Sequence, residues 1–393
     1  MNPMPPATPR RATITDVARE AGTGKTSISR YLNGEMSALS PELRARIEAA
    51  IERLDYQPNQ MARGLKRGRN RLIGMLLADL TNPYTVEVLQ GAEAACHALG
   101  LMPLICHAAN EVEMERRYLQ LLTTYRVEGV IVNALGVREE TLRPVGGGGI
   151  PAVLVDRSVE GLVADMVGLD NRAAAELGTR HLLDNGFDEI WFVVQPFEQV
   201  SSRRLREAAF REVMSARGEW SASAVGGRGE GGWGASGVSG VSGVSGVSRA
   251  GANGRVRGHT LVLDLADSAA VARGLAELDR AIDAAGDASN ASTNAPANAA
   301  RIALFAANAP VALCLALHLK ARYGAAWQSR VALLSIDDPD WAELTGVTTI
   351  RQPTYEIGYR AVEFLHERIE GVQTSARDCL LPGELIVRAS TLR

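Results

Sequence analysis

Continuous apolar runs alternate with helical segments over most of this chain, and this alternation constrains the fold more than any other feature. After Arg71 the runs LIGMLLADL, LMPLICHA, VEGVIVNAL and IPAVLVDR are separated by stretches with helical spacing, and the alternation resumes with EIWFVV, HTLVLDL, RIALFAAN and VALLSIDD. Strands that are apolar along their whole length are typical of parallel sheets covered by helices on both faces. The sequence therefore predicts an α/β core of two doubly wound units.

Two stretches interrupt this order. Residues 218–258 include GVSGVSGVSGVS, and residues 284–300, which follow a helix expected near 268–284, read AAGDASNASTNAPANAA. Segments this poor in large apolar side chains cannot bury enough surface to offset the entropy of ordering. We expect both to be disordered, solvent-exposed insertions in one subdomain, and we expect the Pro-rich residues 1–12 to be disordered as well.

Residues 13–58 have a different pattern, in which apolar side chains recur at helical spacing over short segments. The spacing predicts a first helix over 15–21 and a second over 25–32, separated by the turn residues GTG. A third helix is predicted to begin after Ser40, a favourable N-cap, with Pro41 in the first helical position. Two short helices joined by a tight turn form the helix-turn-helix arrangement, whose second helix lies in the major groove of DNA.

The charge distribution supports a nucleic-acid partner. The 393 residues carry a net charge of −3, but residues 1–71 hold 13 Lys and Arg against 7 Asp and Glu, a net of +6, which leaves −9 for the rest. Cations placed near phosphates release condensed counterions, so a basic head on an acidic body favours binding to a polyanion. The alternative is that the head is merely a solvated basic tail.

Motifs of other function classes are absent from the sequence. GTGKTS has the order of a phosphate-binding loop, but that loop needs a glycine five positions before Gly24, where Arg19 stands. Neither G-x-S-x-G nor H-E-x-x-H occurs, the six histidines are scattered, and the four cysteines form no C-x-x-C pair. We therefore expect no enzyme activity, no metal and no cofactor. No apolar leader region and no run of about 18 apolar residues occurs, so we expect a cytoplasmic protein without a membrane partner.

The predicted second helix has a hydrophilic side that suits a DNA groove. Arg30 is the candidate for a bidentate contact with guanine, and Lys25 and Thr26 are candidates for neighbouring base edges. Thr23 and Ser27 are expected to contact phosphates or to cap the helix.

Two long stretches of the head, TITDVAREAGTGKTSISRYLNG and SPELRARIEAAIERLDYQPNQMARGLKRG, resemble the lactose-repressor family of bacterial transcription regulators. The resemblance implies that residues 59–71 form a hinge helix that folds on operator DNA and inserts Leu65 into the minor groove, with Ala62 as its packing partner. An apolar wedge of this kind unstacks a base step and kinks the duplex. The DNA-contacting positions that we expect are Thr15, Thr23, Lys25, Thr26, Ser27, Ser29, Arg30, Asn33, Tyr56, Asn59, Ala62 and Leu65.

Polar residues in the body follow the predicted strands at their carboxyl ends. In a doubly wound sheet, ligands bind beyond these ends of the strands. The sequence therefore predicts one cleft that brings together Asp79, Asn133, Asp156, Arg157, Asn308, Asp337 and Asp338.

The body resembles the same family through SSRRLREAAF and VALLSIDDPDWAELTGVTTIRQPTYEIGYRAV. The resemblance implies a core related to periplasmic sugar-binding proteins, with an effector between two subdomains. The fork of Arg206 can hold a carboxylate or a pair of sugar hydroxyls. DDPDWAEL followed by TTIRQPTYEIG is most similar to members answering to sugar acids such as ketogluconate or ketodeoxygluconate. The effector-lining positions implied by the resemblance are Tyr84, Asp156, Arg157, Ser202, Arg206, Asn308 and Asp337.

These features together predict the organisation and the function of the chain. A helix-turn-helix domain at 13–58 and a hinge helix or linker at 59–71 precede a core at 72–393. The first subdomain of the core is expected at about 72–170 plus 353–378, and the second at about 171–352 plus the C-terminal strand.

We expect a sequence-specific repressor, controlled by a small sugar or sugar-acid effector. It would bind pseudo-palindromic operator DNA as a homodimer and associate with the nucleoid. The alternative is a sugar-binding transport or chemotaxis receptor without DNA regulation. The sequence leaves open whether the effector releases or strengthens DNA binding, and whether the protein is a dimer or a tetramer.

Overall fold

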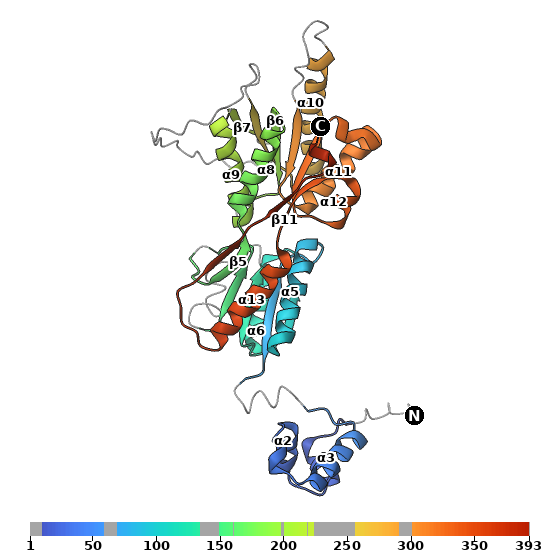
Figure 1. Cartoon of the computed structure of the whole chain (residues 1–393), viewed down its shortest axis with the longest axis vertical. Helices are drawn as coiled ribbons and strands as arrows, with labels where there is room; N and C mark the ends of the chain where they lie inside the picture. Colours follow the sequence, from blue (N-terminus) through green and yellow to red (C-terminus); the bar gives the residue numbers. More distant parts are fainter. Residues whose placement is uncertain are drawn as a thin grey trace, which may run out of the picture. The chain divides into compact units, whose positions relative to one another are not determined.

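The structure is a computed structural model that divides into two compact units, Met1–Arg71 and Leu72–Arg393 (Figure 1). The expectations for the Pro-rich start, most of the hinge segment and most of both insertions lie outside the described residues. The ranges that the structure describes are 10–58, 69–133, 149–159, 161–197, 200–217, 219–223, 256–290 and 301–392.

The first unit is a small helical bundle. Its elements are α1 (Ile14–Glu20), α2 (Lys25–Leu32), the 3₁₀ turn η1 (Met36–Ala38) and α3 (Pro41–Arg53). The predicted start of α3 is confirmed, since Ser40 Oγ accepts a hydrogen bond from the backbone N–H of Leu43 at 3.3 Å and Pro41 is the first helical residue. One apolar core holds the helices together, made of Val17, Ala18, Ala21, Ile28, Leu39, Ile47 and Ala50.

The second unit contains two sheets in its described residues. The first has the strand order β12-β5-β4-β3-β1-β2 and is parallel throughout. Its strands are β1 (Leu72–Leu77), β2 (Met102–His107), β3 (Gly129–Asn133), β4 (Ala152–Val155), β5 (Asp165–Leu169) and β12 (Asp378–Leu381).

The second sheet has the order β13-β11-β10-β9-β6-β8-β7 and is parallel except between β11 and β13. Its strands are β6 (Glu189–Val194), β7 (Glu219–Ser223), β8 (Arg257–Val262), β9 (Ile302–Ala306), β10 (Ala332–Ile336), β11 (Thr348–Arg351) and β13 (Glu384–Ile386).

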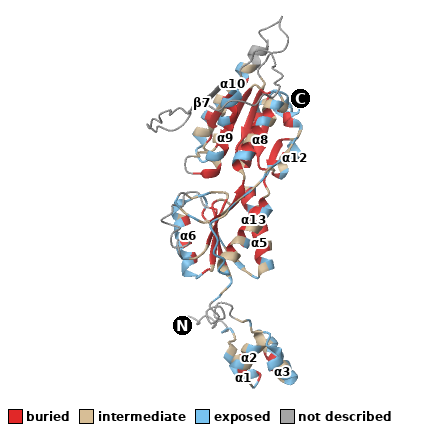
Figure 2. Ribbon diagram, turned by 60° about the vertical axis from the view of Figure 1, so that its left-hand side comes forward, coloured by how far each residue is buried: buried red, intermediate tan, exposed pale blue. Residues whose placement is uncertain are grey.

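Helices cover both faces of each sheet, which confirms the predicted fold class. On the first sheet, α5 (Pro83–Leu99) and α13 (Thr354–Ile369) pack on one face and α6 (Val112–Thr124) on the other. On the second sheet, α8 (Asn171–Asp184) and α9 (Ser201–Arg217) lie opposite α10 (Ser268–Asn290) and α11 (Ala309–Tyr323). The short α12 (Asp340–Thr345), η2 (Gly324–Ser329) and η3 (Ala389–Thr391) complete this subdomain. Figure 2 shows the buried residues concentrated on the strands, as expected for sheets sandwiched between helices.

Two glycines allow α5 and α13 to pack backbone against backbone. A Cβ atom added at Gly358 would lie 1.9 Å from the backbone oxygen of Val88, and one added at Gly91 would lie 1.9 Å from that of Tyr355. Both distances are far below van der Waals contact, so no larger residue fits without moving a helix. This contact fixes α13, which begins directly after the crossing from the second sheet.

The chain passes between the two sheets at three places in the described ranges. β5 leads into α8, β11 leads into α13, and β12 leads into β13. The first and third crossings are joined, because the backbone N–H of Asp170 donates to the oxygen of Leu381 at 2.8 Å. The crossings place the carboxyl ends of strands from both sheets beside the junction of the subdomains.

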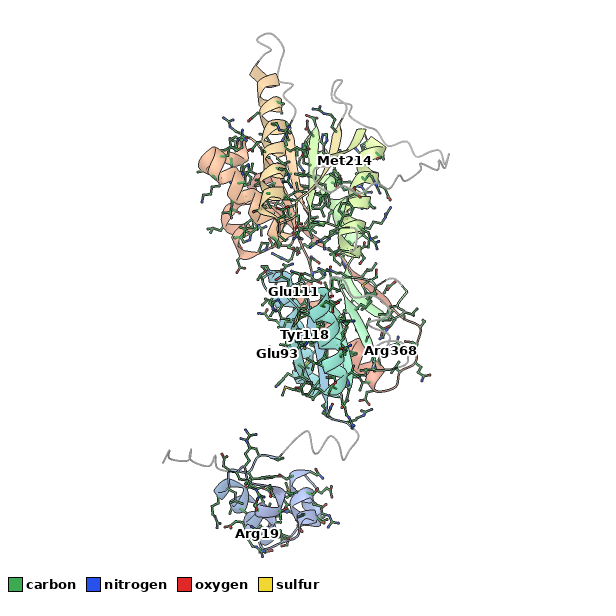
Figure 3. All side chains as sticks on the ribbon, turned by 180° about the vertical axis from the view of Figure 1, so that it is seen from behind. Arg19, Glu93, Glu111, Tyr118, Met214 and Arg368 are labelled. Atoms are coloured by element: carbon green, nitrogen blue, oxygen red, sulfur yellow. The ribbon has the colours of Figure 1, made fainter. Side chains whose placement is uncertain are left out.

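An ion cluster far from this junction holds three segments of the first subdomain together. The carboxylate of Asp165, at the start of β5, accepts hydrogen bonds from Arg368 Nε and Nη2 at 2.8 Å and from Arg377 Nη2 at 2.9 Å. Arg368 lies on α13, as labelled in Figure 3. Burial alone would raise the pKa of Asp165, but hydrogen bonds from the two arginines outweigh it and hold that pKa well below its ordinary value.

Two element boundaries differ from the sequence prediction. The insertion expected from 218 contains β7, which pairs with β8 as a parallel edge strand. Glu219 lies opposite Arg257, and Ser223 lies opposite Leu261. An edge strand needs only the backbone hydrogen bonds of its neighbour, so its composition does not reveal it. The insertion expected from 284 is helical to Asn290 as the end of α10. Alanine is the strongest helix former, and reading an Ala-rich segment as low complexity overlooked this preference.

Candidate DNA interface and ligand cleft

The turn between α1 and α2 is held in place by a side chain of α3. Arg46 donates from Nε and Nη2 to the backbone oxygen of Ala21 at 3.1 and 2.6 Å, and from Nη2 to that of Gly22 at 2.9 Å. Gly22 has φ +60°, a left-handed conformation that favours glycine. Because carbonyl groups at a helix end need partners, this guanidinium fixes the angle at which α2 leaves the bundle.

The outer side of α2 is hydrophilic and accessible. Lys25, Thr26 and Arg30 are exposed, whereas Ile28 on the opposite side is fully buried. Arg30 is half exposed, and its Nε lies 4.0 Å from Glu35 Oε2. A surface pair of this length contributes little, so the guanidinium can turn toward another acceptor.

The other predicted DNA contacts are distributed around the same helices. Thr15 is exposed, while Thr23, Ser27, Ser29, Asn33 and Tyr56 are half-buried. The N-cap of α2 is Gly24, and no side chain caps this helix, so a capping role for Thr23 or Ser27 is wrong and their phosphate contacts stay a prediction. Asn59, Ala62 and Leu65 lie outside the described residues.

A cavity of about 610 Å³ lies between the two subdomains of the second unit. The first subdomain contributes the end of β3 and residues after β1, β2 and β4, and the second contributes residues after β6 and β8 and the starts of α9 and α11. This confirms the strand-end argument for Asp79, Asn133, Asp156 and Arg157. Polar residues of the first side are Asp79, Thr81, Asn82, Tyr84, Thr85, Asn110, Asn133, Asp156 and Arg157, and those of the second are Gln195, Arg203 and Asp264.

The remaining predicted effector residues, Ser202, Arg206, Asn308 and Asp337, do not line this cavity. Arg206 is 4% exposed and donates from Nε to Asn171 Oδ1 and from Nη1 to the backbone oxygen of Ala307, both at 2.7 Å. Its Nη2 lies 4.0 Å from Asp156 Oδ1, and Ser202 Oγ donates to Asp156 Oδ2 at 3.3 Å. Arg206 and Ser202 thus contact the cleft through the carboxylate of Asp156.

Asn308 and Asp337 are also buried and bonded within the protein. Asn308 caps α11 by accepting from Val311 N–H at 3.1 Å, and its Nδ2 donates to Gln195 Oε1 at 2.8 Å. Asp337 accepts from the backbone N–H of Ala309 at 2.8 Å and from Gln352 Nε2 at 2.5 Å. Burial raises the pKa of Asp337, while Arg206 and these hydrogen bonds oppose the rise.

The two carboxylates at the strand ends have strained backbones. Asp156 after β4 has φ +66°, and Asp337 after β10 has φ +79°. Non-glycine residues in this region carry strain of about 1–3 kcal/mol each, and such strain concentrates at ligand sites. The backbone strain at Asp156 and Asp337 thus marks both positions as candidates for a role in ligand binding.

Tyr84 stands between these groups. It is 7% exposed, and its Oη has no hydrogen-bond partner among the described residues. Burial raises the pKa of Tyr84 well above its ordinary value, and the charge of Asp156 adds to this effect. A buried hydroxyl without a partner is rare in native proteins, so this atom indicates where a ligand group or an ordered water would sit.

A second cavity of about 280 Å³ adjoins Tyr84 on the side of α12. Asp337, Asp338 and Gln352 line it, and Gln352 Oε1 is buried without a partner among the described residues. Asp338 accepts hydrogen bonds from Arg388, Thr349 and Arg351, so it belongs to a structural network and not to the main cleft.

Sequence reasoning missed several polar residues of these walls, among them Gln195, Arg203, Asp264 and Gln352. Gln195, Asp264 and Gln352 come within two residues of the ends of β6, β8 and β11, so the strand-end argument would have found them. Arg203 carries no such signal, since it belongs to the first turn of a helix.

No helix in the described part of the chain is long and apolar enough to cross a membrane. Among the same residues, no group of three or more His, Cys, Asp and Glu side chains could hold a metal ion.

A helix-turn-helix unit joined to an α/β core of two subdomains with a polar cleft defines a DNA-binding protein of the ligand-responsive class. Comparison with known proteins agrees with this class. The family described as bacterial regulatory proteins, lacI family, matches residues 13–59, and the family of periplasmic binding proteins and sugar binding domain of the LacI family matches 70–222. A periplasmic binding protein-like domain matches 245–391. The chain belongs to the lacI family of bacterial transcription regulators.

Individual relatives cover almost the whole chain. The HTH-type transcriptional regulator PtxS of Pseudomonas aeruginosa is 37% identical over 383 residues, which span 97% of this chain and 96% of that protein. The HTH-type transcriptional regulator KdgR of Bacillus subtilis is 29% identical over 380 residues, 96% of this chain and 97% of that one. The crystal structure of the lac repressor dimer bound to operator and the anti-inducer ONPF has a TM-score of 0.72 at 19% identity, covering 98% of this chain and 100% of that chain.

These findings confirm the family and the function of a DNA-binding transcription regulator, and they agree with the expectation that the protein is not an enzyme. The alternative of a transport or chemotaxis receptor is not favoured, because the match to the regulator family includes the helix-turn-helix.

Proposed function

We propose that this regulator is a homodimeric repressor whose affinity for a pseudo-palindromic operator changes when a small sugar or sugar acid binds in the 610 Å³ cleft. The observation that carries the proposal is the cleft itself, which both subdomains line with hydrogen-bonding side chains. It adjoins the hydroxyl of Tyr84, which has no hydrogen-bond partner in the described part of the chain. A ligand that contacts both walls binds one arrangement of the subdomains better than another, and this difference changes the population of DNA-binding conformers.

The DNA side of the proposal rests on α2. Exposed Lys25, Thr26 and Arg30 would contact base edges in the major groove, with Ser29 beside them. Contacts to the phosphates are assigned to Thr15, Thr23, Ser27, Asn33 and Tyr56. Asn59, Ala62 and Leu65 would form the minor-groove part of the interface.

The effector side rests on two layers of residues. Tyr84, Asp156 and Arg157 line the cleft and would contact the ligand directly. Behind them, Ser202, Arg206, Asn308 and Asp337 would hold the first layer in position and exchange some of their present hydrogen bonds when the ligand enters.

A dimer follows from the size of the recognition unit, since one helix-turn-helix reads too few base pairs and paired half-sites mirror two-fold symmetry. Leu313 and Leu317 support it, because they are exposed apolar side chains one helical turn apart on α11. As a repressor the protein would act in the cytoplasm on nucleoid DNA.

Titration of the DNA upstream of its own gene tests the proposal. The purified full chain is titrated against this fragment and against random duplex, at two salt concentrations, with and without a panel of sugars and sugar acids. We expect preference for the specific fragment and a change in its apparent affinity with at least one compound. No discrimination between the fragments, or no effect of any compound, would contradict the proposal.

A further inference from the structure

We infer that Arg157 and Arg203 form a carboxylate-binding pair across the cleft, and that Arg203 makes the protein select a hydroxylated acid over the corresponding neutral sugar. This inference rests on the proposed function, since it assumes that the cleft holds the effector. It adds the charge of the ligand and the residue that recognises it.

The two arginines come from different subdomains. Arg157 follows β4 of the first subdomain, and Arg203 lies in the first turn of α9 in the second. Both line the same cavity. Two like charges that approach from opposite walls repel each other, and an anion between them changes this repulsion into attraction to a common partner.

Arg203 forms no ion pair within 4.0 Å among the described residues. Its Nη1 donates to the backbone oxygen of Pro196 and its Nη2 to Gln195 Oε1, both at 2.8 Å. Both acceptors are neutral, and a guanidinium carries five N–H donors, so further donors remain available to a ligand. Burial, together with the cation of Arg157, lowers the pKa of Arg203 to about 10. The carboxylates of Asp156 and Asp264 oppose this lowering, but neither forms an ion pair with Arg203, so a bound anion would add compensation for the burial of the cation.

Arg206 differs from Arg203 in having a carboxylate of the protein at ion-pair distance. Arg206 also donates two hydrogen bonds, to Asn171 and to the backbone oxygen of Ala307, but its Nη2 in addition lies 4.0 Å from the carboxylate of Asp156. Arg206 therefore has a carboxylate at ion-pair distance within the protein, whereas Arg203 has none among the described residues.

The carboxylates of the cavity wall limit which groups the ligand can carry besides its own carboxylate. Asp156 is neutralised by Arg157, whose Nε lies 3.3 Å away. Asp79 accepts from Thr81 and Asn110, and Asp264 accepts from the backbone N–H of Ala266. Neither carboxylate forms an ion pair with Arg or Lys among the described residues. Carboxylate oxygens accept hydrogen bonds from hydroxyl groups and repel additional anionic charge. The wall thus fits a polyhydroxy chain with one carboxylate, and it disfavours a phosphate dianion.

Arg204 offers a matched control for Arg203. It is the next residue on the same helix, it carries the same charge and it is exposed to solvent. An Arg204→Gln variant changes the net charge as Arg203→Gln does, while leaving the cavity wall intact.

The test is calorimetric titration of the full-length protein with matched ligands, namely gluconate, 2-ketogluconate, glucitol and glucose 6-phosphate, repeated with Arg203→Gln and Arg204→Gln. For the wild type we expect one of the two acids to bind at least about tenfold more tightly than glucitol, since a hydrogen bond to a charged group commonly contributes that much. Arg203→Gln should lose at least about tenfold for that acid with glucitol unchanged, and Arg204→Gln should match the wild type. An Arg203→Lys variant, which keeps the charge, should retain part of the preference.

The outcomes separate the inference from the proposed function. Equal or tighter binding of glucitol or of the sugar phosphate by the wild type, or unchanged acid affinity in Arg203→Gln, would overturn the carboxylate pair. If operator affinity still responds to one of these ligands, the proposed function stands without it. If no compound in the wider panel changes operator affinity, both fail.

Discussion

Replacing Asp165 by Asn should destabilise the first subdomain strongly, because it removes the only carboxylate shared by two arginines in the described cluster. Its side chain is fully buried, and it accepts hydrogen bonds from both guanidinium groups and from the backbone N–H of Arg377. Asparagine offers one acceptor oxygen and turns an N–H₂ group toward donors. Removing one partner of a buried ion pair typically costs about 3–5 kcal/mol, and we expect a loss of free energy of unfolding in this range.

The pH dependence of this loss has a definite sign. The pKa of Asp165 is depressed in the folded state, so the ion cluster contributes its full stability above the ordinary carboxyl pKa and loses it as the pH falls toward the folded value. At pH 3.5, wild type should have lost about 0.7 kcal/mol of this contribution, given an unfolded pKa near 3.9. The difference between wild type and Asp165→Asn should therefore be constant at neutral pH and begin to shrink below pH ~5.

Urea denaturation followed by circular dichroism measures the difference, with Glu367→Gln as the control. Glu367 pairs with Arg377 at 2.6 Å but is nearly half exposed, so its replacement should cost less than about 1 kcal/mol. An Asp165→Asn loss below about 1 kcal/mol at pH 7, or a difference that grows as the pH falls, would refute the reasoning.

Three further substitutions test the interface, the cleft and the helix packing. Arg30→Ala should weaken operator binding by about 1–3 kcal/mol and relax one base position, which a binding-site selection would show; an unchanged base preference would remove Arg30 from the base contacts. Arg206→Ala should leave operator binding intact and abolish the effector response in a DNA titration. The substitution removes the hydrogen bond to Asn171 and the cation beside Asp156. A normal effector response would exclude Arg206 from the site. Gly358→Ala should lower the free energy of unfolding by about 1–3 kcal/mol, since the added Cβ would lie 1.9 Å from a backbone oxygen of α5. A melting temperature equal to that of the wild type would show that α5 and α13 can move apart without strain.

Much of the fold could be predicted from short stretches of the chain. The runs that became β1, β3, β6, β9 and β10 are apolar at nearly every position because both faces of each strand are covered, and this property is visible without knowledge of the partners. The start of α3 is equally local, since Ser40 and Pro41 act within one turn. β7 was missed because its partner, β8, begins more than 30 residues later, after a segment of low complexity.

The ligand cleft could be predicted only in part. Strand ends were sufficient to find Asp156 and Arg157, since all carboxyl ends of a parallel sheet lie at one edge. They could not show that Arg206 and Asp337 would be hydrogen-bonded within the protein and absent from the wall of the main cleft, or that Arg203 would line it. These outcomes depend on how closely the two subdomains approach.

The chain's local patterns thus specify the elements, the class of fold and the groove-facing helix, because caps, apolar periodicity and charge act over a few residues. Long-range packing determines which side chains contact each other. Asp165 forms ion pairs with Arg368 and Arg377, which lie more than 200 residues later in the sequence, and Arg157 lines the same cavity as Arg203 of the other subdomain. These contacts depend on the three places where the chain crosses between the sheets and on the close glycine contact between α5 and α13. No short stretch of sequence contains that geometry.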